Sequence, residues 1–242
     1  MNHESELYLR DGLEIQARKV LETKCKLKGR KYWLNWRKRV LDVLVASPSF
    51  ALALPVIALI GTAILIDDGH WPIIRLKRNH PSLGEIPLHK LRTMIPDAEA
   101  QARELEIAGG ASLRTLKRQS SDPRITRLGR VLRKMSLDEL PQFGDVALGR
   151  FSMVGPRFLS VLEWKKIDDQ QGTQPFREFI ALFNDKLPYG LTGLDGIFGR
   201  GDLELAESVS LGVLYGQEAS FFGDLKILTL TIPAVLSARG AY

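Results

Sequence analysis

The 242-residue sequence has few residues that could form cross-links or bind transition metals. It contains one cysteine, Cys25, and four histidines. A single cysteine cannot form a disulfide within the chain, which fits a reducing compartment. The histidines are scattered without the spacing of metal ligands, which argues against a metal site built from Cys and His.

Other common signatures are also missing from the sequence. Residues 1–27 are polar and charged and lack the apolar core of a cleaved signal peptide. Residues 186–200 are glycine-rich, but their glycines have neither the P-loop nor the dinucleotide-binding spacing. We therefore predict a loop there, and neither of these two phosphate-binding motifs.

Positive charge is abundant, with a net charge of +6, and predicts an anionic partner such as nucleic acid, phospholipid or nucleotide. Between Lys28 and Arg39 basic and aromatic residues interleave, as they also do in nucleic-acid-binding arms. The apolar run Val40–Ile66 that follows favours a membrane interface instead. We predict membrane lipid as a partner and no specific nucleic-acid binding.

The apolar run has the length of a membrane segment. As one straight helix its 27 residues would reach about 40 Å, more than the roughly 30 Å of a bilayer core. Pro48 and Pro55 interrupt the run, and both of its flanks are basic. A helix-break-helix that enters and leaves on one face satisfies both basic flanks, whereas a spanning helix tolerates proline. The residues alone leave re-entrant and spanning helices equally supported.

Two short strands are predicted beyond this segment, at residues 71–77 and 86–92, around a turn at residues 80–84. Lys90 and Arg92 share one face of the second strand, as a solvated face or a phosphate-binding edge. A basic amphipathic helix follows Asp122–Thr126, with Leu128, Val131, Leu132 and Met135 on its apolar face. Arg133 lies on its basic face.

The segment Ser136–Gln142 places two adjacent carboxylates, Asp138 and Glu139, where a helix is expected to begin. We predict a helix start at Asp138, since Pro141 then falls among the first residues, whose N–H groups have no partner. Adjacent like charges raise one pKa unless a cation intervenes, and a divalent metal or Lys90, Arg133 and Arg157 could keep both ionised. An ionised carboxylate could attack phosphorus. On this segment alone, simple helix capping is the preferred interpretation.

The C-terminal part alternates short amphipathic segments and turns. Met153–Arg157 reads as a short strand that enters a Gly-Pro turn with a cation at its tip. Helices are predicted at residues 159–167, 176–183 and 203–220. An apolar segment at residues 225–236 is too short to span a bilayer and would pack in the core or lie in the membrane interface.

Together these motifs resemble the bacterial sugar transferase family, the monotopic phosphoglycosyl transferases. The resemblance covers about residues 38–230, and the order of its motifs makes it specific. The matching motifs are Lys38–Asp42, Pro55, His89–Met94, Asp122–Gly129, Ser136–Gln142, Ser152–Arg157, Gly190–Gly193 and Gly199–Arg200. This order favours a catalytic over a capping role for the carboxylate pair.

The resemblance implies a mostly helical α/β fold and an enzyme. It would comprise a polar and basic arm (1–36), a re-entrant membrane helix broken at Pro55 (37–69) and a cytoplasmic transferase domain (70–242). Such enzymes transfer a sugar-1-phosphate from a UDP-sugar to undecaprenyl phosphate with Mg²⁺, at the cytoplasmic face of the bacterial inner membrane.

The resemblance also implies roles for individual residues. Asp138 would be the nucleophile that attacks the sugar-linked phosphate, and Glu139 would hold the magnesium, with Asp138 as a second metal contact. Four basic residues would bind phosphate or the nucleotide sugar: Lys90, Arg133, Arg157 and Arg200.

The sequence departs from the family's usual pattern at several positions. Leu54 stands where a serine is common, Asp145 where asparagine is usual, and Phe158 where a proline follows Gly-Pro-Arg. Tyr189 and Gly196 replace a proline and a glutamine, and Gly212 replaces an aspartate. The later departures motivate an alternative, a non-catalytic scaffold for glycan synthesis. The carboxylate pair and Arg157 are intact, which argues for an active enzyme.

Overall fold

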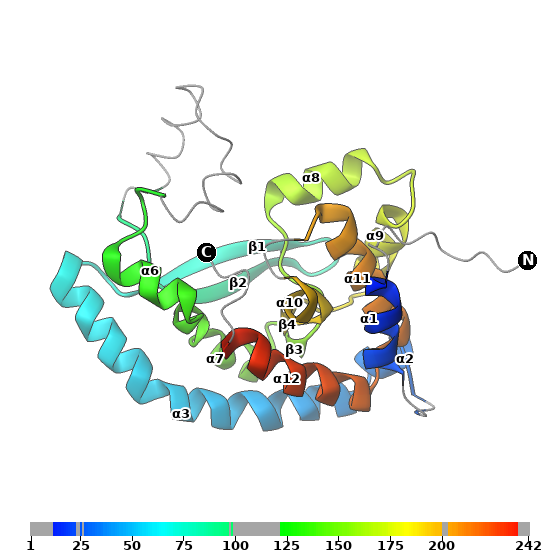
Figure 1. Ribbon diagram of the computed structural model, residues 1–242, viewed down its shortest axis with the longest axis horizontal. Coiled ribbons are helices and arrows are strands. Elements are labelled where there is room, and N and C mark those ends of the chain that lie inside the picture. The colour runs from blue at the N-terminus through cyan, green and yellow to red at the C-terminus, as the bar shows by residue number, and fades with distance from the viewer. Residues whose placement is uncertain are drawn as a thin grey trace, which may run out of the picture.

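The structure is a computed structural model that describes residues 12–22, 25, 27–96, 98, 122–199 and 203–236. Helices dominate the described chain, together with two small sheets of two strands each (Figure 1), as predicted for a mostly helical α/β fold. The elements in chain order are α1 (Leu13–Leu21), α2 (Arg30–Trp33), α3 (Trp36–Asp68), β1 (Ile73–His80), β2 (Gly84–Leu91), α6 (Arg127–Lys134), η1 (Leu137–Glu139), α7 (Gln142–Ala147), β3 (Ser152–Val154), α8 (Val161–Asp169), α9 (Phe176–Asn184), β4 (Gly190–Thr192), α10 (Leu194–Phe198), α11 (Leu205–Glu218) and α12 (Phe221–Leu236).

Helix α3 contains the predicted membrane segment and is 33 residues long. Within the described chain it is the one helix long and apolar enough to cross a membrane. Asn35 caps its start by accepting a hydrogen bond from the Arg37 N–H, and Gly69 ends it in the left-handed conformation, at a φ of 71°. One stripe of α3 packs on the protein, while large apolar side chains elsewhere on it, such as Leu52, Leu59 and Ile66, are exposed. Such a surface suits lipid rather than water.

The predicted break of this helix at Pro55 is wrong, since α3 is helical without interruption through both Pro48 and Pro55. The helix instead bends along its length (Figure 1). Proline removes one backbone hydrogen bond and clashes with the preceding turn, and this kinks a helix whose flanking turns are intact.

The basic and aromatic residues before α3 are partly used inside the protein. Tyr32 and Trp33 belong to the basic and aromatic stretch between Lys28 and Arg39, for which the sequence favours a membrane interface. Both are buried, and the Trp33 indole donates to the Gly216 carbonyl at 3.0 Å. Arg39 donates to the carbonyls of Val146 and Ala147 and so caps the C-terminal end of α7. Trp36, in the same stretch, is exposed. These side chains pack inward because α2 lies against α11, and α7 and α12 lie against α3.

The predicted strand pair is confirmed as the antiparallel hairpin β1–β2, in which Ile74 pairs with Lys90 and Arg75 with His89. Since neighbouring strand residues point to opposite faces, Lys90 and His89 reach different parts of the protein. After β2 the chain crosses α6 closely: a Cβ on Gly129 would lie 2.1 Å from the Thr93 carbonyl oxygen. Only glycine permits this approach. On the predicted apolar face of α6, Leu132 is buried, whereas Val131 and Met135 are exposed.

The glycine-rich segment is not the loop that the sequence predicts. It contains β4, which pairs in parallel with β3, and the short helix α10. A Cβ on Gly190 would lie 2.0 Å from the Gly155 nitrogen, so these glycines let the two strands meet at the Gly-Pro turn. Their role is close backbone packing.

An aromatic core holds α8, α9 and β4 together, and it accounts for three of the departures from the family pattern. The rings of Phe158 and Tyr189 stack with centroids 4.6 Å apart, and the Tyr189 hydroxyl donates to the Asn79 carbonyl. Gly212 faces Phe179, whose ring carbon would lie 2.5 Å from an added Cβ. The rings of Phe158 and Tyr189 therefore fill space in this core, and the missing side chain of Gly212 leaves room for the ring of Phe179.

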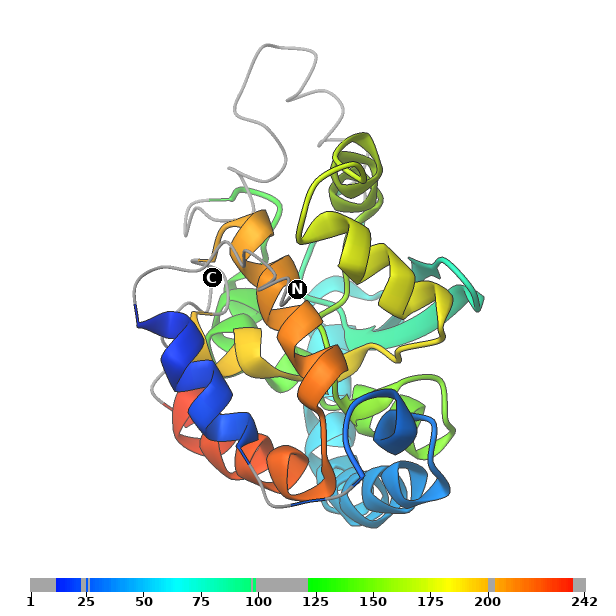
Figure 2. The ribbon, with the colours of Figure 1, turned by 90° about the vertical axis from the view of Figure 1, so that its right-hand side faces the viewer.

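Helix α12 lies beside the first half of α3, and in both orthogonal views the two helices form the same lower edge of the molecule (Figures 1 and 2). Phe222 and Ile232 on α12 are exposed, as are Leu44 and Leu52 on α3. One side of α12 packs on the protein, which confirms the predicted core contact, and its other side extends the exposed apolar edge.

Candidate active site

The two carboxylates lie in a short turn. Asp138 and Glu139 belong to the 3₁₀ helix η1, and Ser136 just before it adopts the left-handed conformation at a φ of 55°. The predicted helix start at Asp138 is wrong: α7 begins at Gln142, with Pro141 as its N-cap residue. Pro141 has no N–H to donate, so the turn tightens before it and the regular helix begins after it.

Lys90 joins the carboxylates from the neighbouring hairpin. Its Nζ lies 2.7 Å from Glu139 Oε1 and 3.4 Å from Asp138 Oδ2. The Asp138 side chain is 8 % exposed, whereas that of Glu139 is 38 % exposed. The pair is thus asymmetric, with one enclosed carboxylate and one that reaches solvent.

The enclosed position of Asp138 changes its acidity. Burial raises the pKa of Asp138 above its ordinary value, and the Lys90 ammonium and Arg133 guanidinium offset only part of that rise, while the Glu139 charge adds to it. Burial lowers the pKa of Lys90, but the carboxylates of Glu139 and Asp138 outweigh it, so the net direction is upward. Lys90 and Arg133 thus act on Asp138 in the predicted direction, while burial, which the sequence interpretation did not weigh, has the largest effect on its pKa.

Arg133 approaches from α6. Its Nε donates to Thr93 Oγ1 at 2.9 Å, and its charge acts on Asp138. The Thr126 side chain caps the start of α6 by accepting from the Gly129 N–H. Hence the close crossing at Gly129 determines where Arg133 lies relative to the carboxylates.

Arg157 belongs to a second cluster, at the end of the Gly-Pro turn. Its Nη2 donates to Glu163 at 2.7 Å, its Nε donates to Ser208 at 2.9 Å, and Asp195 lies 3.8 Å away. Glu163 also closes the capping box of α8 with Ser160. The structure therefore places Arg157 among its own carboxylates. Arg200 lies outside the described residues.

Glu163→Gln is expected to lower the free energy of unfolding at pH 7 by about 1–3 kcal/mol. Burial raises the pKa of Glu163, but Arg157 and Ser160 lower it by more than burial raises it. The result is a pKa of about 2, below the ordinary value. A carboxyl group with a depressed pKa stabilises the fold above its unfolded pKa, and this contribution disappears as the pH falls through the folded pKa.

The difference between Glu163→Gln and the unmodified chain should therefore shrink between about pH 4.5 and pH 2. Denaturant unfolding across this range measures it. Glu85→Gln is the matched control, because Glu85 forms an exposed pair with Lys77 on the hairpin and should change stability by less than about 0.5 kcal/mol. A Glu163→Gln deficit that is independent of pH would contradict the assignment.

The sequence interpretation did not predict two further polar clusters. Asp145 accepts from the His89 backbone N–H at 2.8 Å, lies 2.7 Å from His89 Nδ1, and pairs with Arg150. In the second cluster Lys38 pairs with Asp42 and with Asp224 from α12. The spacing of Lys38 and Asp42 beside an apolar run could have signalled a buried pair, since two charges one helical turn apart share a face.

Metal-binding capacity in the described chain is limited to pairs, because it contains no cluster of three or more His, Cys, Asp or Glu side chains. Asp138 and Glu139 nevertheless offer adjacent carboxylate oxygens, one of them on a solvent-exposed side chain. Mg²⁺ uses one or two carboxylates together with water and substrate phosphates. The donor set therefore fits magnesium.

The site combines an enclosed carboxylate with an exposed one, and a lysine contacts both, on the same body as a long apolar helix. The family model for bacterial sugar transferases matches residues 33–238, and the chain belongs to this family. It is a phosphoglycosyl transferase, and α3 together with family membership indicates membrane association.

Several curated proteins are similar over most of the chain. The exopolysaccharide production protein ExoY of Rhizobium meliloti is 35% identical over 85% of this chain and 88% of its own length. The UDP-glucose:undecaprenyl-phosphate glucose-1-phosphate transferase of Caulobacter vibrioides is 35% identical over 86% of this chain and 73% of its own length. The undecaprenyl-phosphate galactose phosphotransferase of Salmonella typhimurium is 30% identical, over 85% and 41% respectively.

Proposed function

We propose that this protein transfers a sugar-1-phosphate from a UDP-sugar to undecaprenyl phosphate, with Asp138 as the covalent nucleophile. The observation that supports this most is the position of Asp138, enclosed beside Glu139 and Lys90. Relatives named for glucose-1-phosphate and galactose phosphate transfer to undecaprenyl phosphate support the substrate classes. The product would initiate a surface or exopolysaccharide glycan.

The reaction would proceed in two displacements. An Asp138 carboxylate oxygen attacks the sugar-linked phosphorus, a bond to that oxygen forms, the diphosphate P–O bond breaks and UMP leaves. A phosphate oxygen of undecaprenyl phosphate then attacks the same phosphorus, and the acyl-phosphate bond breaks. The lipid-linked sugar diphosphate is released and the Asp138 carboxylate is regenerated.

The other residues would neutralise phosphate charge. Lys90 and Arg133 lie around Asp138 and would bind the transferred phosphoryl oxygens. Mg²⁺ held by Glu139 and Asp138 would supply further charge neutralisation on the diphosphate. Arg157, held by Glu163 and near Asp195, would bind phosphate. Arg200 would contact the nucleotide sugar.

We place the active site at the cytoplasmic face of the bacterial inner membrane. The lipid acceptor is confined to the bilayer, and the apolar edge formed by α3 and α12 would bring the carboxylate pair to its surface. A bent, re-entrant α3 would keep both of its ends on that face, in line with its basic flanks.

A direct test is release of UMP by the purified protein in nanodiscs with Mg²⁺, undecaprenyl phosphate and a panel of UDP-sugars. We expect UMP release with at least one donor, ping-pong kinetics, and loss of release in EDTA that Mg²⁺ restores. A non-catalytic scaffold would release no UMP with any donor. The packing roles of Phe158, Tyr189 and Gly212 remove part of the motivation for that alternative.

Lys90→Met is expected to lower kcat/KM about 10²-fold and to move the acid limb of the pH profile to higher pH. The Lys90 ammonium opposes the burial that raises the pKa of Asp138, so its removal leaves the nucleophile protonated over a wider range. UMP release measured from pH 5 to pH 9 checks this. Lys77→Met, on the exposed side of β1, is the control, and an unchanged acid limb in Lys90→Met would count against the coupling.

A further inference from the structure

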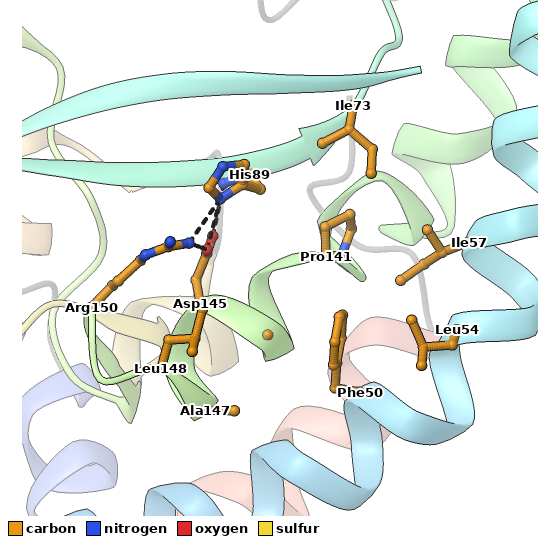
Figure 3. Close-up of a pocket in the computed structure, with 11 residues that line it drawn as sticks. Phe50, Leu54, Ile57, Ile73, His89, Pro141, Asp145, Ala147, Leu148 and Arg150 are labelled. Carbon is orange, nitrogen blue, oxygen red and sulfur yellow. Dashed lines mark hydrogen bonds and ion pairs between the residues drawn. The ribbon is translucent and has the colours of Figure 1, made fainter. Parts of the chain in front are cut away.

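An apolar groove of about 400 Å³ lies between α3 and α7 (Figure 3). Phe50, Leu54 and Ile57 form its wall on α3, and Pro141 and Leu148 line it from the α7 side. Its size and mostly apolar walls are those of a site for a small apolar ligand or one segment of a chain. Leu54, where the family commonly has serine, extends the apolar wall.

The polar residues at one end of the groove neutralise one another. The Asp145 carboxylate is met by the His89 backbone N–H, the His89 ring and the Arg150 guanidinium (Figure 3). Asp145 is buried, so its charge is compensated within this cluster. The groove therefore suits a hydrocarbon better than a charged or strongly polar ligand.

Two features of the groove bear on the proposed reaction. Leu54 and Leu148 are 48 % and 70 % exposed, so the groove is open at an exposed apolar rim that includes part of α3. Pro141, which lines the groove, follows Glu139 by two residues. Phe50, Ile57 and Ile73 of the groove also belong to one apolar cluster with Leu137 and Leu140, which flank the two carboxylates. The groove thus lies beside the turn that carries the carboxylate pair, and part of its apolar rim is exposed.

We propose that this groove binds the phosphate-proximal isoprenoid units of the lipid acceptor and thereby directs its phosphate to Asp138. This inference rests on the proposed function. A bulk phospholipid has no need to present its phosphate to the carboxylate pair, whereas the acceptor must do so in the second displacement. The groove then acts on acceptor binding alone and leaves the donor step untouched.

Leu54→Trp fills the groove, and Leu52→Trp is its matched control, since Leu52 is 78 % exposed on the same helix and does not line the groove. In nanodiscs, we expect Leu54→Trp to raise the KM for undecaprenyl phosphate at least tenfold. Without acceptor, the stoichiometric release of UMP and the labelling of the protein by the UDP-sugar should stay within twofold of the unmodified chain. Leu52→Trp should match the unmodified chain in both measurements.

An unchanged acceptor KM in Leu54→Trp would overturn the inference, as would an equal loss of both half-reactions. A binding readout separates this outcome from failure of the proposed function. An isoprenyl phosphate with a diazirine near its phosphate should cross-link to residues 47–57 or 141–150 of the unmodified protein, and Leu54→Trp should reduce this labelling whether or not UMP is released. Cross-links confined to other segments, or labelling abolished by excess phospholipid but not by excess isoprenyl phosphate, would contradict the assignment.

Discussion

Asp138→Asn is expected to reduce turnover by at least about 10³-fold, which corresponds to about 4 kcal/mol of lost transition-state stabilisation. Covalent labelling by a radioactive UDP-sugar should disappear with it, because the amide cannot form the acyl-phosphate. UMP release and label retained on the denatured protein are the two measurements. Undiminished turnover would refute the assignment of the nucleophile.

The same variant should be at least as stable as the unmodified protein. Burial raises the pKa of Asp138, so its ionised form costs folding free energy at neutral pH, a cost that an uncharged amide avoids. A carboxyl group with a raised pKa, such as that of Asp138, stabilises the fold fully only below its unfolded pKa, and this contribution is lost as the pH rises through its folded pKa. Thermal unfolding should therefore give an equal or higher Tm for Asp138→Asn. Asp169→Asn, an exposed position on α8, should leave both activity and Tm unchanged.

Asp224→Ala is expected to destabilise the protein by about 3–5 kcal/mol, the largest stability effect we predict. Asp224 is fully buried and accepts from Lys38 Nζ at 2.7 Å, from the Tyr32 hydroxyl at 2.8 Å and from the Tyr215 hydroxyl at 3.0 Å. The substitution would leave the buried Lys38 ammonium with too little compensation. Denaturant unfolding in detergent measures the loss.

A double variant tests whether the loss comes from the unpaired charge. Lys38→Met with Asp224→Leu replaces both charges by apolar groups of similar size, and such replacements are often neutral or stabilising. Asp42 would still be held by Ser152 and by the Met153 N–H. We expect the double variant to recover at least half of the loss. A single Asp224→Ala variant within about 1 kcal/mol of the unmodified protein would contradict the network's role.

This network explains how the membrane helix is held on the catalytic body. Lys38 and Asp42 lie on α3, Asp224 lies on α12, and Asp42 accepts from the Met153 N–H of β3. The strand β3 runs directly into the Gly-Pro turn and Arg157. Buried hydrogen bonds therefore connect α3 to the strand that leads into the turn.

The sequence by itself determined the features that depend on neighbouring residues. The apolar run that becomes α3, the hairpin that presents Lys90 and the basic helix that presents Arg133 all follow from periodicity and composition, which are local properties. Motif order was sufficient to place the chain in its family. Helix boundaries next to proline were the weak point, as the late start of α7 at Gln142 shows.

Only the tertiary structure decided which charges meet. Lys90 pairs with carboxylates that lie 48 and 49 positions away in the sequence. Arg157 pairs with Glu163 and lies near Asp195. Lys38 pairs with Asp224, which is 186 positions away. The glycine-rich segment predicted as a loop forms a close contact between two strands. Tyr32 and Trp33, from the stretch expected at the membrane interface, are buried in the core. Such contacts depend on how helices pack, and packing brings together residues whose distance in sequence carries no information about their distance in space.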